Sequence, residues 1–249
     1  MSLSSIVFGL FMSIVAAGGA WAENTHVTVR VLANDAKFVG TSMGGAEVII
    51  RDVVTGEVLA KGLTSGGTGD TALIMQTPRV RGQAIVSEGS ASFAATLDLD
   101  TPRLLEVSVR GPLTPNARAV EATSQQWVVP GKHISSGNAW LVELRGLVVE
   151  MVDLPVEVVG ETVVLQARVR MMCGCPTSPG GMWDSDGMDV EVLLEKDGVV
   201  SKVPLAFSGK ASHFAAKAPV AKGHYKAVFY AYQASTGNTG VVTGSFVVH

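Results

Sequence analysis

The chain has 249 residues, of which 47% are hydrophobic and 16% charged, and its formal net charge is −3. Its Lys and Arg residues are scattered along the sequence, which argues against a nucleic-acid interface or a surface for anionic membranes. Glycine is abundant, with 28 residues, and apolar residues alternate with polar ones without a sustained helical period. The composition therefore predicts an all-β protein with many short strands and tight turns.

The first 22 residues are predicted to be a signal peptide. Residues 6–17 form an apolar run too short to span a bilayer as a helix. The segment Ala20-Trp21-Ala22 then offers small residues for cleavage before Glu23. No Lys or Arg precedes the run, so an uncleaved N-terminal anchor is the alternative. We expect a periplasmic or secreted protein with no membrane span in its mature part.

Residues 23–113 are predicted to form a first β-sandwich. The segment 26–32 alternates apolar and polar residues, as a half-buried strand does. A glycine-rich loop at 64–71 has no lysine and leads into a predicted strand, so it is interpreted as a turn and not as a phosphate-binding loop. The predicted strands are 26–32, 46–52, 57–62, 72–75, 83–87, 91–97 and 104–110.

This part of the chain resembles the carboxypeptidase regulatory-like, or transthyretin-like, β-sandwich modules. The residues that carry the resemblance are Gly45-Ala46-Glu47-Val48, Asp52, Thr55-Gly56, Gly62-Leu63-Thr64 and Gly67-Thr68-Gly69. The resemblance implies the fold and an accessory or binding role. It implies no particular activity, because such a fold carries many functions.

Residues 114–154 are predicted to connect two domains, because Pro112 and Pro115 close the preceding strands. Further strands are predicted at 125–131, 139–144 and 147–152, and the sequence leaves open which sandwich they complete. Packing between the domains is the role predicted for Trp127 and Trp140, and ligand stacking is the alternative.

Residues 155–249 are predicted to form a second sandwich. Asp197-Gly198 marks a hairpin, and a turn is expected at 236–240. The pattern of Gly223, Tyr225 and Ala231, with Phe246 and Val248 near the end, resembles bacterial immunoglobulin-like domains of exported proteins. That resemblance implies an immunoglobulin-like β-sandwich. The predicted strands are 161–170, 188–196, 199–207, 211–218, 223–232 and 244–248.

The two cysteines of the chain, Cys173 and Cys175, lie one residue apart in a loop of the second sandwich. A disulfide between them is predicted, because exported thiols oxidise and Gly174 relieves strain in so small a ring. Redox exchange or free thiols is a further interpretation. Alternation along the preceding strand places Met171 inward and Met172 outward. A soft-metal site for Cu(I) is the alternative, with Cys173, Cys175, Met172, Met182, Met188 and His213 as candidate ligands.

No arrangement of residues in the sequence predicts catalysis, so we expect no catalytic residue and no required cofactor. The predicted function is an exported binding, assembly or accessory protein of the cell envelope, which recognises another envelope or exported protein through the Cys173–Cys175 loop. A periplasmic copper-binding or redox protein is one alternative. Binding of a carbohydrate or peptide by Trp127, Trp140 or Trp183 is the other.

Overall fold

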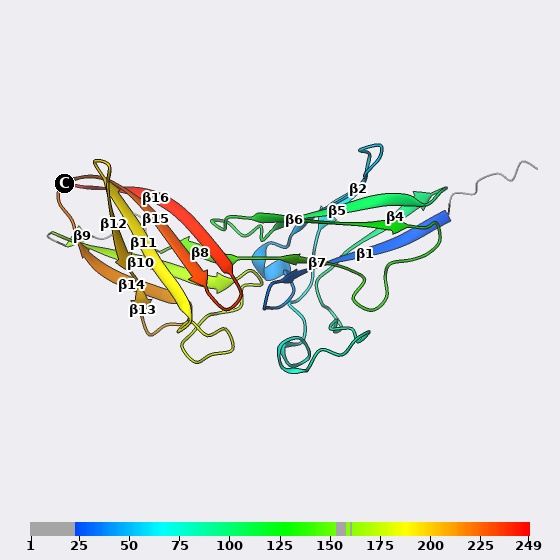
Figure 1. The fold of residues 1–249 in the computed structure, drawn as a ribbon, viewed down its shortest axis with the longest axis horizontal. Helices are drawn as coiled ribbons and strands as arrows, with labels where there is room; N and C mark the ends of the chain where they lie inside the picture. Colours follow the sequence, from blue (N-terminus) through cyan, green and yellow to red (C-terminus); the bar gives the residue numbers. More distant parts are fainter. Residues whose placement is uncertain (1–22, 153–157, 160) are drawn as a thin grey trace, which may run out of the picture.

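The protein is an all-β rod of two β-sandwiches placed end to end (Figure 1). The computed structural model describes residues 23–152, 158–159 and 161–249, so the predicted signal peptide lies outside the described residues. The prediction of an all-β chain with two tandem sandwiches is confirmed. Among the described residues, no helix has the length and hydropathy needed to cross a membrane.

Two sheets form the first sandwich, and residues that alternate along their strands fill the space between them. One sheet has the order β4–β1–β7, with β1 antiparallel to β4 and parallel to β7. Its strands are β1 (Glu23–Ala33), β4 (Phe93–Leu99) and β7 (Trp140–Leu144). The other sheet has the order β3–β2–β5–β6, from β2 (Glu47–Asp52), β3 (Val58–Leu63), β5 (Arg103–Gly111) and β6 (Val120–Val128).

The second sandwich also consists of two sheets, and all the strand pairs of its described residues are antiparallel. One sheet contains β8 (Leu147–Met151), β9 (Val158–Val159), β10 (Thr162–Met171), β13 (Ala206–Phe207) and β14 (His213–Pro219). The other has the order β12–β11–β15–β16, from β11 (Met188–Lys196), β12 (Val199–Pro204), β15 (Gly223–Gln233) and β16 (Asn238–Val248). Along β10 every second residue is buried, which matches the alternation in its sequence.

The predicted connecting region contributes strands to both sandwiches. Strand β6 pairs with β5 and strand β7 pairs with β1, so both belong to the first sandwich. Strand β8 pairs with β10 and belongs to the second. The chain therefore passes from one sandwich to the other between Leu144 and Leu147.

The segment 64–92 differs from the sequence-based prediction. Residues 72–75 are not a strand but part of a five-residue π-helix, η2 (Ala72–Gln76), and no strand forms at 83–87. The Asp70 carboxylate accepts the backbone N–H of Leu73 at 2.7 Å, which favours a helical turn here. The apolar residues of this segment, Ile74 and Ile85, are buried in a separate small cluster with Phe38. Burial in this cluster, and not in a sheet, explains the apolar pattern that predicted strands.

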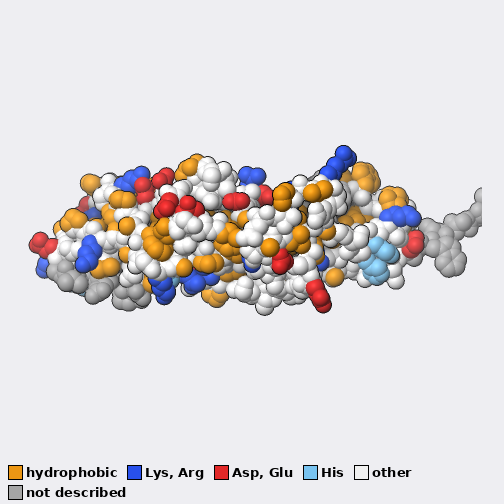
Figure 2. Space-filling view, turned by 90° about the horizontal axis from the view of Figure 1, so that it is seen from below, with side chains coloured by type: hydrophobic (Ala, Val, Ile, Leu, Met, Phe, Trp, Pro, Cys, Tyr) orange, Lys and Arg blue, Asp and Glu red, His pale blue; other side chains and the backbone are white. Residues whose placement is uncertain are grey.

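A single buried cluster continues from the first sandwich into the second. It includes Val29 of β1, Val107 of β5, Leu165 of β10 and Phe229 of β15. A continuous core of this kind favours a fixed arrangement of the two sandwiches, because separating them would expose apolar surface. On the face shown in Figure 2, Lys and Arg side chains are interspersed with Asp and Glu along the whole rod.

A buried carboxylate stabilises the turn after β2, and its effect should depend on pH. Asp52 accepts the backbone N–H groups of Thr55 at 2.9 Å and Val54 at 2.8 Å. These bonds, above all the one from Thr55, and the Arg103 guanidinium hold the pKa of the Asp52 carboxyl below its ordinary value. Such a group stabilises the fold above its unfolded-state pKa of about 3.9. That contribution is lost as pH falls through the lower folded-state pKa.

We therefore expect Asp52→Asn to be less stable than the unsubstituted protein at pH 7, with a difference that shrinks as pH falls below about 4. Urea unfolding at a series of pH values measures this difference. Asp197→Asn is the control, because the Asp197 side chain is 83% exposed. A difference that stays constant from pH 7 to acid would contradict the role given to the Asp52 carboxylate.

Candidate functional site

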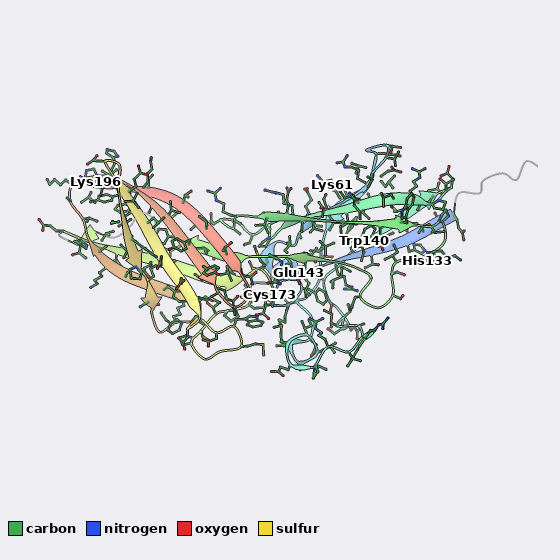
Figure 3. All side chains as sticks on the ribbon, in the orientation of Figure 1. Lys61, His133, Trp140, Glu143, Cys173 and Lys196 are labelled. Carbon is green, nitrogen blue, oxygen red and sulfur yellow. A yellow bond between two sulfur atoms is a disulfide. The ribbon has the colours of Figure 1, made fainter. Side chains whose placement is uncertain are left out.

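The cysteine loop lies in the middle of the molecule, where the two sandwiches meet (Figure 3). Cys173 and Cys175 form a disulfide, and their exposed fractions are 1% and 6%. The ring closes so few residues that its entropic stabilisation is small, about 2 kcal/mol. The two cysteines are buried, whereas other residues of the same loop, such as Met182, are exposed.

The cover over this loop comes from the first sandwich. Gly174 has a φ of 83°, and a Cβ at this position would lie 2.6 Å from the Sδ atom of Met43 in η1 (Thr41–Met43). Met172 is only 1% exposed, although alternation predicts that it faces outward. Its methyl group lies against Gly146, where a Cβ would approach it to 2.6 Å. The prediction for Met172 is wrong because β10 ends at Met171 and the chain turns at residues 172 and 173, so the alternation of the strand no longer applies there.

The candidate copper ligands lie in different environments in this structure. Both thiolates that would bind Cu(I) are joined in the disulfide. Met182 is 45% exposed, whereas Met188 begins β11 in the opposite sheet from β10. His213 pairs with Arg168 of β10, and its Nδ1 lies 2.8 Å from the carbonyl oxygen of Ala211. The described part of the chain contains no group of three or more His, Cys, Asp or Glu side chains suited to a metal.

A partly buried ion pair lies beside the cysteine loop. Arg170 precedes the loop on β10 and donates to the Glu150 carboxylate on β8 at 2.9 Å, with side chains that are 11% and 15% exposed. Its other terminal nitrogen lies 3.5 Å from the Sδ atom of Met43. Arg168 is a more distant second cation for Glu150, at 3.9 Å. The pair thus links β10 and β8 to the methionine contributed by the first sandwich.

Polar contacts hold the two sandwiches together elsewhere in the junction. Trp183 follows the cysteines in the sequence, and its indole N–H donates to the backbone oxygen of Asp35 at 3.1 Å. Burial raises the pKa of the Asp35 carboxyl. Asn238 accepts the N–H of Gly146 at 2.9 Å through its side-chain oxygen and donates to the carbonyl of Asn34 at 3.3 Å. These contacts are expected to fix the orientation of the second sandwich on the first.

The three candidate ligand-binding tryptophans lie in different environments. Trp183 is buried at the junction, with 8% exposed. Trp140 is 4% exposed inside the first sandwich, where its indole N–H donates to Ser124 at 3.2 Å. Trp127 is 65% exposed on the outward side of β6, where it pairs with Leu104. The packing between domains that was predicted for Trp127 and Trp140 is therefore made by Trp183.

The open edge of β16 is a further candidate site, which the sequence did not indicate. Among the described residues, β16 forms a strand ladder only with β15, so its other edge carries no ladder, while Gly240 and Gly244 of the strand lie against Leu147 and Met151 of β8. The strand begins at Asn238 and not at 244, because the preceding turn ends at Gly237, whose φ is 72°. It has 11 residues and is the longest edge strand of the described sheets. None of these residues is charged, and Val241 and Val247 are 45% and 40% exposed.

Two adjoining cavities lie beside this edge, between the two sandwiches. The larger, of about 570 Å³, is lined by Asn116, Ala117, Arg118, Met151, Val242 and Thr243. The smaller, of about 370 Å³, shares Arg118 and Thr243 and adds Val120, Leu147 and Val241. Strand β16 and the segment 116–120 form the walls of this groove, with β8 residues contributing to its lining. We call it the β16 groove.

Comparison with known proteins gives no family for this chain. No family model matches the sequence, and no curated protein matches it. Among solved structures, it is similar to the chicken interferon gamma receptor alpha chain, with a TM-score of 0.34 and 10% sequence identity. The similarity covers 92% of this chain and 98% of the receptor chain.

Proposed function

We propose that this chain is an exported, non-catalytic binding or assembly protein of the cell envelope, and that it binds an extended strand of another protein at the edge of β16. The observation that carries the proposal is the length of this open, uncharged edge strand. The proposal includes export by the predicted signal peptide into the periplasm or out of the cell. The first sandwich resembles carboxypeptidase regulatory-like modules, and the second resembles bacterial immunoglobulin-like domains. Both resemblances support an accessory role.

An edge strand presents a row of backbone N–H and C=O groups that can form hydrogen bonds with an added strand. Proteins usually protect such edges by keeping them short, or with charged side chains or proline. The other edge strands of the described sheets follow this rule. Strands β9 and β13 have two residues each, and the charged or proline residues of the others are Lys61 in β3, Asp98 in β4, Glu121 in β6, Glu143 in β7, Glu150 in β8, and Lys202 and Pro204 in β12.

Strand β16 is therefore the exception among these edges, and strand addition is the binding mode that its chemistry supports. The added strand would obtain affinity from main-chain hydrogen bonds and specificity from side chains that enter neighbouring pockets. The β16 groove supplies such pockets, lined partly by apolar residues. A rigid junction would keep the groove preformed, which reduces the cost of binding.

The proposal predicts that charges on β16 abolish strand binding. A displayed library of nine-residue peptides with alternating apolar and polar residues would be selected against the immobilised mature protein. We expect strand-forming peptides to be enriched and to bind at least tenfold more weakly to a Val241→Lys, Val247→Lys variant, because a charged edge disfavours strand pairing. Fluorescence anisotropy of the selected peptides measures the affinities.

The matched control is a Val199→Lys, Val200→Lys variant. These residues lie on β12, the opposite edge of the same sheet, and are 72% and 57% exposed. The control should bind the selected peptides as the unsubstituted protein does. Equal affinity for all three proteins would show that the edge of β16 is not the binding site.

A further inference from the structure

The β16 groove contains a single charged side chain among its lining residues, that of Arg118. This arginine lies in the part that the two cavities share, so it occupies the middle of the groove. Apolar side chains lie on both sides of it. Met151 and Val242 line the larger cavity, and Val120 and Leu147 line the smaller.

The Arg118 guanidinium is available to a ligand. Among the described residues, the guanidinium donates to the Thr243 hydroxyl at 3.5 Å, which is long for a hydrogen bond and therefore weak. No carboxylate of the described residues forms an ion pair with Arg118, whose side chain is exposed. A guanidinium has five donors in a planar fork, an arrangement that suits a carboxylate.

The spacing of side chains along an extended strand then determines which residues of a bound segment face the groove. Side chains at positions i−2, i and i+2 of a strand face the same side and follow one another by about 7 Å. If position i lies opposite Arg118, positions i−2 and i+2 face the apolar parts of the two cavities.

We propose that the β16 groove selects an extended segment of a partner protein with the pattern apolar-x-acidic-x-apolar, in which the acidic side chain pairs with Arg118. This inference rests on the proposed function, since it names the partner segment for the same edge strand. The main chain of the segment bonds to β16, and the ion pair sets its register along the groove.

The test uses three nine-residue peptides that differ at one position. The first is Ser-Thr-Val-Thr-Asp-Thr-Val-Thr-Ser, and the other two carry Asn or Lys in place of Asp. Binding of each labelled peptide to the full mature protein is measured by fluorescence anisotropy. We expect the Asp peptide to bind about fivefold more tightly than the Asn peptide, and the Lys peptide to bind most weakly. The preference for Asp should decrease from 50 mM to 500 mM salt, as about a threefold shorter Debye length screens the pair.

A charge reversal provides the decisive measurement. In Arg118→Glu the order of affinities should invert, so that the Lys peptide binds most tightly. Arg81→Glu makes the same change on an exposed loop outside the groove and should keep the original order. Unchanged thermal unfolding of both variants shows that the fold is retained.

The outcomes separate this inference from the proposed function. If all three peptides bind equally well to the unsubstituted protein but lose affinity in the Val241→Lys, Val247→Lys variant, strand binding stands and the acidic pattern is overturned. If no peptide binds and sedimentation shows a dimer that these lysines dissociate, a second copy occupies the edge and the inference is overturned. Absence of both binding and dimers overturns the inference together with the proposed function.

Discussion

Replacement of Arg170 by methionine is expected to lower the free energy of unfolding by about 3 kcal/mol. The Glu150 carboxylate, which is 15% exposed, would then keep its charge without its closest partner. An unpaired charge in such a position loses more than the ion pair itself contributes, because desolvation is no longer compensated. We place the loss of stability at the lower end of the range that is usual for breaking a buried ion pair, because Arg168 remains 3.9 Å from the Glu150 carboxylate. Urea unfolding at neutral pH measures the change.

Two further variants test whether the unpaired charge is the cause. Substituting both Arg170→Met and Glu150→Met should recover most of the lost stability, since no buried charge remains. Arg145→Met is the matched surface control, because Arg145 is 72% exposed and its partner Glu143 is 41% exposed. This substitution should lower the free energy of unfolding by less than about 1 kcal/mol. A double variant as unstable as Arg170→Met alone would assign the effect to lost side-chain packing.

Local sequence patterns predict most strands of this protein. Successive side chains of a strand point to opposite faces of its sheet, so buried and exposed positions alternate along the sequence. Strand β10 is the clearest case, since its buried residues are the apolar ones of the alternation. The pattern is ambiguous at 72–87, where apolar residues are buried under a loop with Phe38 and no neighbouring strand is available for pairing. A run of apolar residues shows that burial occurs, but not which partner buries it.

The contacts at the junction of the two sandwiches could not be predicted from local sequence patterns, for a related reason. A Cys-Gly-Cys segment in an exported protein predicts its own disulfide, because both partners are adjacent in sequence. Its burial depends on Met43, which lies about 130 residues earlier and has no signal that connects it to Gly174. The role of Trp183 depends in the same way on the backbone of Asp35. Only the arrangement of the sandwiches brings these residues together.

The edge of β16 shows a third limit of sequence reasoning. The sequence predicts a strand only at 244–248, because Gly237 and Gly240 indicate a turn at 236–240. Whether a strand lies at the edge or in the centre of a sheet follows from the order β12–β11–β15–β16, which is a property of the fold. An uncharged strand is ordinary in the centre of a sheet and unusual at its edge.

Substitution of Gly240 by alanine is the second change with a large expected effect, about 3 kcal/mol of destabilisation. A Cβ on Gly240 would lie 2.3 Å from the backbone oxygen of Leu147 and 2.8 Å from a methyl group of Val149. Both neighbours belong to β8, which is itself hydrogen-bonded to β10, so the contact cannot be relieved by a side-chain rotation. The first half of β16 must then move away from β8.

The control for this substitution is Gly187→Ala, where a Cβ meets no atom within 4 Å. The control should remain within about 0.5 kcal/mol of the unsubstituted protein in urea unfolding, as surface substitutions usually do. Gly240→Ala should also weaken binding of the peptides that require β16, because the displaced strand alters the walls of the groove that it forms with the segment 116–120. Equal stability of the two glycine variants would contradict the close approach of β16 to β8. Stability loss with unchanged peptide affinity would confine the displacement to the end of the strand nearest the junction.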